Sequence, residues 1–402
     1  MTGKRTVSQN TIIILCWLVY CTAYLGRYSY NSNITLIIDD FKVSNAAAGA
    51  VGTAFFFAYA IGQVIHGIMS RRYNKKWIFP IALFGSSVIN LAVFFGIPFY
   101  AIKYLWFVNG LLQSCLWPSL IAVLSMTLDK ESMNKAVILM STTTCVGTVM
   151  SYGSSSLIVW LGNYRFAFLI GAILMSLIGF VWLIIYNAEE RYVPVNKVKT
   201  EAGGRKTAIA GGLLITIIIM AVFAVSDNFV KDGLTTWAPV IFKSRYGLRD
   251  EASILLSLIL PVIGILGAIL SVFLNKYIKD FISLCGIMFA ISAMFLVFVC
   301  MVPGIGLLLS VICFAVAVLM MHGINNVLTS IAPLRMRDKI DSGRLAGLLN
   351  GFCYVGSTLS AYGLGRVADI SGWNTVFMLL LGMCVLAVII CVIHRAVRAK
   401  VS

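Results

Sequence analysis

Charged residues are scarce in this chain of 402 residues. They make up 11% of it, and apolar residues make up 60%, against about 45–50% in soluble proteins. This composition excludes a soluble globular domain. Acidic residues are rarer than basic ones, 15 against 31, but the basic residues lie in loops between apolar runs and not along one face or arm. The basic excess therefore does not indicate a nucleic-acid partner.

The sequence also lacks the short motifs of common enzymes. It contains no Walker loop, no HExxH or GxSxG motif, no CxxC pair and no metal-ligand cluster. We therefore expect neither an enzyme nor a bound cofactor or metal ion. The ten cysteines fall inside apolar runs, which is typical of small packing residues. The first apolar run, from about Thr11, has no small-residue cleavage site, so we expect a retained helix and not a signal peptide.

Long apolar runs, separated by charged or Gly/Pro/Asn turns, dominate the chain. A membrane-spanning helix needs roughly 20 apolar residues, so these runs predict twelve spans with little chain left for other domains. The fold class is thus an all-α membrane protein with twelve transmembrane helices. The expected helices cover residues 11–37, 46–69, 77–97, 101–127, 134–161, 166–187, 207–243, 251–275, 282–302, 305–331, 343–368 and 373–394.

One long polar stretch, Asn187 to Lys206, follows the sixth predicted helix. It divides the chain into a bundle at 1–186, a linker at 187–206 and a second bundle at 207–402. With both termini inside, 22 basic residues fall on the cytoplasmic side and seven on the other, as the positive-inside rule requires. We therefore expect a multi-pass protein of the cytoplasmic (inner) membrane with a cytoplasmic linker.

The two predicted bundles resemble each other in sequence. Cys145-Val-Gly-Thr148 matches Tyr354-Val-Gly-Ser357 at an offset of 209 residues, and Arg27 pairs with Lys231 at an offset of 204. Two six-helix bundles related by pseudo-two-fold symmetry, with a substrate site where they meet, are the plan of the major facilitator fold. The internal repeat therefore predicts that fold.

Arg27 and Lys231 are the two basic residues that the positive-inside count assigns to neither side, because they lie well inside predicted helices and away from their ends. A cation at bilayer depth costs about 2.5–3.5 kcal/mol on insertion scales, so we favour a function over simple pairing or snorkelling. The two occupy matching places in the two bundles and together form a trap for an anion. A phosphate ester, which carries about −1.5 to −2 charge at neutral pH, fits such a pair.

Polar residues accompany the basic pair on both helices. Tyr20, Tyr24, Arg27 and Asn31 recur at steps of four, three and four, so they share one face of the first helix. Tyr24 is the stronger candidate for the site, because Tyr20 lies nearer the cytoplasmic half, where simple packing is equally plausible.

On the seventh predicted helix, Asp227, Asn228 and Lys231 are spaced i, i+1 and i+4. We expect Asp227 to pair with Lys231 when the site is empty and Asp232 to point elsewhere. In the tenth helix, His322 begins a polar cluster that needs partners or cavity water.

Several motifs resemble those of the organophosphate:phosphate antiporters, the major facilitator group that contains the bacterial glycerol-3-phosphate and hexose-phosphate transporters. The motifs are Tyr20-x-x-x-Tyr24-x-x-Arg27, Ala58-Tyr59, Asn109-Gly110-x-x-Gln113-x-x-x-Trp117-Pro118, Lys231-x-Gly233-x-x-x-Trp237-x-Pro239 and Ala346-Gly347-x-x-x-Gly351-x-x-Tyr354-x-Gly356. The resemblance implies that Arg27 and Lys231 stand at the family's phosphate-binding basic pair. It also implies a less positive site, because Gln63 replaces a usual lysine. Two further departures are His322 at the place of a tyrosine and Lys231 at the place of an arginine.

The predicted function is exchange of a small phosphorylated metabolite for inorganic phosphate by a functional monomer in the lipid bilayer. The rival mechanism is proton-coupled symport of an organic anion such as a carboxylate or sugar acid, with Asp227 or His322 carrying the proton. A rival of another class is a transporter-like sensor of a phosphorylated metabolite. The predicted substrate-binding residues are Arg27, Lys231, Tyr24, Tyr20, Asn31, Tyr59, Gln63, Asp227, Asn228, His322, Asn350 and Tyr354.

The predicted topology can be tested at Asn196, in the middle of the linker. In a background without reactive cysteines, Asn196→Cys should react with a membrane-impermeant thiol reagent only from the cytoplasmic face, because the flanking basic residues hold the linker inside. Labelling in intact cells from the external face would contradict the topology, and Lys103→Cys, in a loop predicted to be external, is the control with the opposite expectation.

Overall fold

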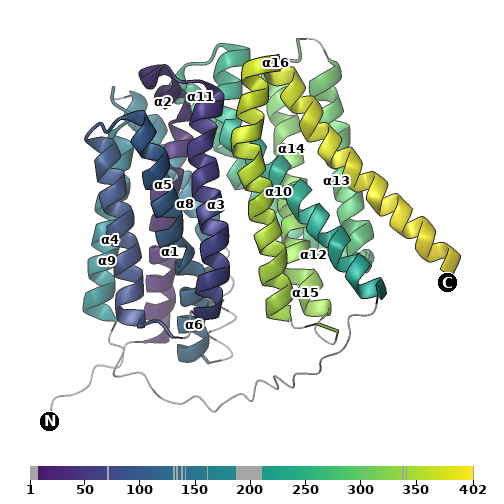
Figure 1. Ribbon diagram of the computed structural model, residues 1–402, viewed down its shortest axis with the longest axis horizontal. Coiled ribbons are helices and arrows are strands. Elements are labelled where there is room, and N and C mark those ends of the chain that lie inside the picture. The colour runs from purple at the N-terminus through teal and green to yellow at the C-terminus, as the bar shows by residue number, and fades with distance from the viewer. Residues whose placement is uncertain are drawn as a thin grey trace.

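The computed structural model describes residues 8–69, 72–129, 132, 135–136, 139–140, 142–160, 162–186, 211–302, 304–336, 339–340 and 342–401. The predicted linker, Asn187 to Lys206, lies outside the described residues. Figure 1 shows the helices gathered into two bundles that stand side by side. The described helices preceding the linker form one bundle and those following it form the other.

The N-terminal bundle begins with a helix that breaks where the sequence predicts continuity over 11–37. Asn33 separates the first two helices, and its side-chain amide donates to the Ser29 carbonyl at 2.8 Å and to the Ser155 hydroxyl at 3.0 Å. The helices of this bundle are α1 (Gln9–Ser32), α2 (Ile34–Phe41), α3 (Asn45–Met69), α4 (Lys75–Phe94), α5 (Phe99–Ser114), α6 (Leu116–Thr127), α8 (Thr143–Trp160) and α9 (Phe166–Ile185).

A second unpredicted break separates α5 from α6 at Cys115, inside the expected helix 101–127. Pro118 has no N–H to donate to the Ser114 carbonyl, so the helix cannot continue unchanged through this turn. The Gln63 amide of α3 donates to that carbonyl at 3.3 Å and supplies the missing hydrogen bond. A side chain from a neighbouring helix thus compensates for the proline.

The C-terminal bundle contains equivalent interruptions. Pro261 follows a break at Leu258, inside the expected helix 251–275, where a helix of 8 residues meets one of 19 residues. Gly372, at a φ of 75°, separates the two halves of the last element, as the sequence predicts. The elements are α10 (Gly211–Tyr246), α11 (Asp250–Ser257), α12 (Ile259–Tyr277), α13 (Phe281–Met301), α14 (Leu307–Asn326), the π-turn η2 (Val327–Ile331), α15 (Ala332–Arg335) and α16 (Ser342–Val401).

Ten helices of the described chain are long and apolar enough to cross a membrane. That count takes Arg344–Val397 as one helix, although Gly372 divides it into two spans. It also omits α8, whose four serines and three threonines dilute its apolar residues. With these two additions, the twelve spans predicted from the sequence are present.

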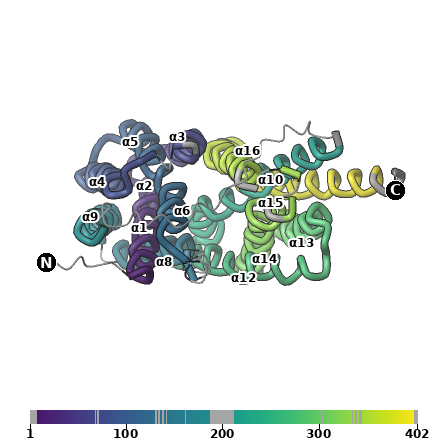
Figure 2. Tube along the Cα trace, turned by 90° about the horizontal axis from the view of Figure 1, so that it is seen from below, coloured from purple at the N-terminus to yellow at the C-terminus, as the bar shows by residue number. Residues whose placement is uncertain are grey.

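Packing within each bundle brings together helices that are distant in the sequence. In the first bundle α1 packs on α8 and α9, α4 on α9, and α3 on α5. In the second bundle α10 and α13 pack on α16, and α12 packs on α14. The bundles meet chiefly through α3 and α16, which lie next to each other in Figure 2.

The two bundles are held together near the upper end of Figure 1. A Cβ atom on Gly49 of α3 would lie 2.1 Å from the Ala361 carbonyl oxygen of α16, so glycine is required for this approach. Close by, the Asp369 carboxylate accepts hydrogen bonds from the backbone N–H groups of Asn45, at 3.0 Å, and Ala46, at 2.7 Å. Asp369 therefore caps the N-terminus of a helix in the other bundle.

Further contacts join the bundles at this same end. Lys243 of α10 pairs with Asp39 of α2 and with Asp250, the latter at 2.7 Å. The Tyr152 hydroxyl of α8 donates to the Thr235 carbonyl at 3.2 Å, and Pro239 leaves that carbonyl without its helical N–H donor. Towards the lower end, where α1 begins, the ribbons of the two bundles diverge.

Removing the charge of Asp369 should weaken the contact that this residue makes between the two bundles. In Asp369→Asn the cap keeps one acceptor but loses the charge that favours a helix N-terminus, a loss of roughly 1 kcal/mol. The population with parted bundles should rise about fivefold, measured as a longer distance between spin labels at Lys42→Cys and Arg366→Cys in a background without reactive cysteines.

Asp40→Asn is the matched control for this measurement. Asp40 bonds to Tyr164, at 2.7 Å, and Arg165, at 2.9 Å, both within its own bundle. The same distance distribution should therefore remain unchanged in Asp40→Asn. Equal distributions in Asp369→Asn and the unsubstituted protein would show that this cap does not hold the bundles together.

Candidate functional site

The Arg27 guanidinium lies in a cage of aromatic rings within the N-terminal bundle. Its Cζ atom is 4.6 Å from the ring centroid of Tyr24, 4.9 Å from that of Phe55 and 4.4 Å from that of Tyr59. The residue is 4% exposed. Cation–π contacts of about 2 kcal/mol are expected for a desolvated cation, so the rings replace part of its hydration and hold it in position.

The polar contacts of Arg27 leave it with unused hydrogen-bonding capacity. Its Nε donates to the Gln113 side-chain oxygen at 3.2 Å, and Gln113 is held in turn by Asn109 at 3.1 Å. Its Nη2 is buried and has no hydrogen-bond partner. Within the described ranges, no carboxylate lies within 4.0 Å of the guanidinium. A buried cation without a counter-ion is costly, so this group is suited to bind an anion.

The four tyrosines predicted from the sequence converge beside Arg27. The hydroxyls of Tyr20 and Tyr59 are 3.4 Å apart, and the rings of Tyr20 and Tyr24 are in edge contact at 5.0 Å between centroids. Tyr354 comes from α16 of the other bundle, and its ring centroid is 4.8 Å from that of Tyr59. The aromatic cage therefore extends across the interface between the bundles.

Asn31 closes the other side of this region. Its amide donates to the Thr236 hydroxyl of α10 at 3.4 Å, which links the bundles one helical turn beyond Arg27. Between Arg27 and Asn31 is a hollow of about 10 Å³, which has room for about one water molecule. It is lined by Arg27, Asn31, Gly52, Phe55, Phe56 and Trp106. A larger anion can reach Arg27 through this hollow only if side chains or bundles move apart.

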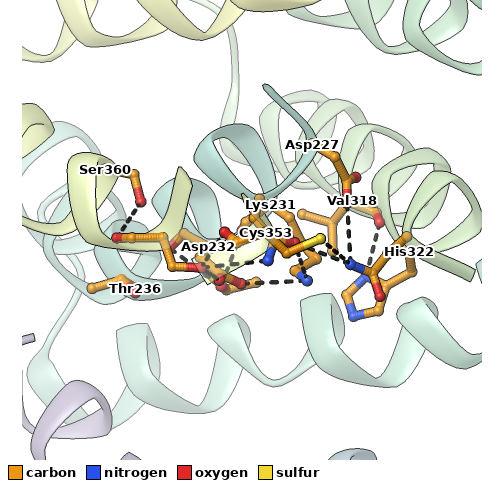
Figure 3. A network of polar contacts seen from close by, with 12 residues as sticks. Asp227, Lys231, Asp232, Thr236, Val318, His322, Cys353 and Ser360 are labelled. Carbon is orange, nitrogen blue, oxygen red and sulfur yellow. Dashed lines mark hydrogen bonds and ion pairs between the residues drawn. The ribbon is translucent and has the colours of Figure 1, made fainter. Parts of the chain in front are cut away.

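Lys231 is the centre of a separate polar network in the C-terminal bundle (Figure 3). Its ammonium donates to the Asn228 side-chain oxygen at 2.6 Å and lies 3.7 Å from an oxygen of Asp232. The Ser357 hydroxyl of α16 donates to the other Asp232 oxygen. The Lys231 side chain is 14% exposed, so its charge is partly shielded but not enclosed.

The predicted ion pair between Asp227 and Lys231 is wrong in this conformation. Asp227 is fully buried, and one of its oxygens accepts a hydrogen bond from Asn325 at 3.3 Å while the other has no partner. Asp232 takes the place beside Lys231 that was expected for Asp227, although the sequence predicted that Asp232 points elsewhere. Two contacts explain this difference: Asp232, which shares a helix face with Asn228, is held by Ser357 of α16, and Asn325 of α14 binds Asp227.

Asn325 and Ser357 also belong to this network and, like Asp232, were not among the predicted site residues. Asn325 also donates to the Asn228 side-chain oxygen at 3.2 Å, and the Asn228 amide donates to Ser357 at 3.4 Å. Ser357 ends the repeat that matches Cys145–Thr148, and Asn325 follows His322 in the polar cluster. Both signals are visible in the sequence, but neither indicates which side chain meets Lys231.

The remaining predicted residues lie at the margins of the candidate site. The Nδ1–H group of His322 donates to the Val318 carbonyl of its own helix, 3.0 Å away. The His322 ring packs on Gly264 of α12, where a Cβ would lie 2.6 Å from Nε2. Gln63 is engaged by the Ser114 carbonyl. Asn350 is half-buried in α16, one turn before Tyr354. Substrate contacts by these residues stay predictions.

Comparison with known proteins identifies relatives over nearly the whole chain. A membrane sensor protein, UhpC of Salmonella typhimurium, is 20% identical over 392 residues, which covers 92% of this chain and 87% of that protein. A probable hexose phosphate transport protein of Chlamydia pneumoniae is 22% identical, covering 92% and 88%. Sugar phosphate exchanger 3 of Bos taurus is 23% identical, covering 82% and 76%. These names agree with the resemblance to organophosphate:phosphate antiporters.

Solved structures share the fold. A bacterial homologue of the human lysosomal transporter Spinster, in an inward-facing and unoccupied conformation, superposes with a TM-score of 0.80 at 15% identity, covering 95% of this chain and 96% of that one. A nucleoside transporter, NupG, gives a TM-score of 0.69 at 16% identity, covering 96% and 98%. The sequence model of the Major Facilitator Superfamily matches residues 16–340. The chain therefore belongs to the Major Facilitator Superfamily, a family of membrane transporters and not of enzymes.

Proposed function

We propose that this protein is a secondary active transporter that exchanges a small phosphorylated metabolite for inorganic phosphate by alternating access. The observation that carries the proposal is the Arg27 guanidinium, which is buried among aromatic rings, retains an unpartnered Nη2 and has no carboxylate beside it in the described chain. A planar guanidinium binds phosphate oxygens through parallel hydrogen bonds. The cage preorganises that group for such a ligand.

Lys231 supplies the second cation from the other bundle. The Asn31–Thr236 hydrogen bond and the Tyr59–Tyr354 ring contact join the bundles near the two cations. A phosphate ester or inorganic phosphate carries enough negative charge to interact with both. An anion held between the bundles would be shared by them, as alternating access requires.

The membrane context supports the same proposal. The described chain contains the spans of a multi-pass membrane protein, and the bundles contact each other at one end while their ribbons diverge at the other. Rocking the bundles about the midplane would exchange the end that is open. The positive-inside count favours the cytoplasmic membrane, with both termini and the linker on the cytoplasmic side. A monomer supplies both cations.

The names of the relatives support a phosphorylated ligand and raise one second candidate. A hexose phosphate transport protein and a sugar phosphate exchanger are among them, but so is a membrane sensor protein that covers 92% of this chain. The second candidate is a sensor that binds the phosphorylated metabolite without turnover. Reconstituted uptake distinguishes the two, because a sensor binds the ligand but does not accumulate it.

The defining experiment is counterflow in proteoliposomes. Vesicles loaded with unlabelled phosphate should accumulate labelled phosphate, and external phosphate esters should release it, with the same rates when a pH gradient is imposed. Uptake that requires the pH gradient would support the rival mechanism of proton symport, for which the fully buried Asp227 is the candidate carrier. Binding without counterflow would support the sensor.

Substitutions of Arg27 test the site itself. Arg27→Lys should weaken phosphate binding about tenfold or more, because an ammonium cannot reproduce the paired hydrogen bonds of a guanidinium, and Arg27→Ala should abolish exchange. The measurements are ligand-induced thermal stabilisation of the purified protein and phosphate exchange in proteoliposomes. Arg165→Lys is the control, since Arg165 pairs with Asp40 within the N-terminal bundle. Unchanged exchange in Arg27→Ala would remove Arg27 from the site.

A further inference from the structure

Asp232 is an acidic residue inside a region otherwise suited to an anion. It shares a helix face with Asn228, Lys231 and Thr235, at spacings of i, i+3, i+4 and i+7 from Asn228. Its side chain is 15% exposed, whereas the neighbouring Asp227 is fully buried. Asp232 is therefore the carboxylate of this network that a ligand can reach.

The contacts of Asp232 leave it with acceptor capacity. One oxygen lies 3.7 Å from the Lys231 ammonium, beyond normal hydrogen-bond distance, and the other accepts from the Ser357 hydroxyl. A carboxylate has about four acceptor positions, so further donors can be accepted. Ser357 also accepts from Asn228, which fixes the orientation of the group.

The position of Asp232 is at the interface between the bundles. One turn further along α10, Thr236 bonds to Asn31, and the Thr235 carbonyl bonds to Tyr152, both from the N-terminal bundle. Lys231 and Asp232 lie in the middle of the network in Figure 3, with Asp227 and His322 to one side and Thr236 and Ser360 to the other. The carboxylate thus lies beside the cation that would hold the phosphate group.

We propose that Asp232 determines which phosphate esters this site accepts: it binds hydroxyl groups on the organic part of the ester and rejects esters that carry a carboxylate. This inference rests on the proposed function, since it needs the phosphate group at Arg27 and Lys231. A second carboxylate in the ligand would meet Asp232 in a region of low dielectric, where like charges repel strongly. A hydroxyl at the same place would donate to it.

Two probes of matched size test the inference. Glycerol 3-phosphate and 3-phosphoglycerate differ only in having an alcohol or a carboxylate at the carbon distant from the phosphate. In competition against labelled inorganic phosphate, the alcohol should bind at least about tenfold more tightly than the carboxylate, since polar groups that lose their partner discriminate strongly. Equal competition, or a preference for the carboxylate, would overturn the inference without any substitution.

Asp232→Asn should reduce this preference to about twofold or less, because the amide is neutral and binds a carboxylate as readily as a hydroxyl. The readout is the ratio of the affinities for the two esters, since an indirect effect on Lys231 would act on the phosphate group of both. Asp232→Glu should retain part of the preference. Thermal stabilisation by each ester provides the same ratio if a variant binds without transporting.

Asp40→Asn is the control, because Asp40 pairs with Arg165 within the N-terminal bundle. The preference of this variant for glycerol 3-phosphate over 3-phosphoglycerate should equal that of the unsubstituted protein. A full preference in Asp232→Asn, or an equal loss in Asp40→Asn, would overturn the assignment to Asp232. Failure of every phosphate compound to bind the unsubstituted protein would overturn the proposed function and this inference together. Phosphate exchange with equal competition by the two esters would overturn this inference alone.

Discussion

The cost of placing an unbalanced charge inside a membrane protein determines most of the candidate site. Arg27 has aromatic rings and an amide around it, while Lys231 has an amide and a carboxylate. The two cations are therefore not equivalent. Arg27 retains its full attraction for an anion, whereas Lys231 is already partly compensated by Asp232. A ligand that binds both must compete with an existing ion pair on one side only.

The backbone obeys the same constraint. Proline leaves a carbonyl without its helical donor, and in a membrane that carbonyl needs another partner. The carbonyl of Ser114, freed by Pro118, is satisfied by Gln63. That of Thr235, freed by Pro239, is satisfied by Tyr152 of the other bundle. The carbonyls that these prolines leave free are thus points at which a neighbouring side chain joins two elements.

Prediction from the sequence succeeded where a pattern is local. Apolar runs identified the spans, and the rarity of cations within them identified Arg27 and Lys231. It failed where the outcome depends on a partner distant in the chain. Helical spacing favours Asp227 over the adjacent Asp232 as the partner of Lys231. The hydrogen bonds of Asn325 on α14 to Asp227 and of Ser357 on α16 to Asp232 reverse this order. The role of Gln63 could not be predicted either, because it depends on the contact between α3 and α5.

Helix α10 joins the candidate site to the contacts that hold the bundles together. Within this one helix, Lys231 meets the proposed anion, Thr235 and Thr236 bond to the N-terminal bundle, and Lys243 pairs with Asp39. Parting the bundles at this end must break the Tyr152 bond and leave the Thr235 carbonyl unsatisfied, since Pro239 removes its helical donor. That cost favours the closed arrangement. An anion shifts the equilibrium between the closed and the parted arrangement only if it binds one of them more tightly. Lys231, which would bind the anion, lies one helical turn from the Thr235 carbonyl, whose lost hydrogen bond opposes parting.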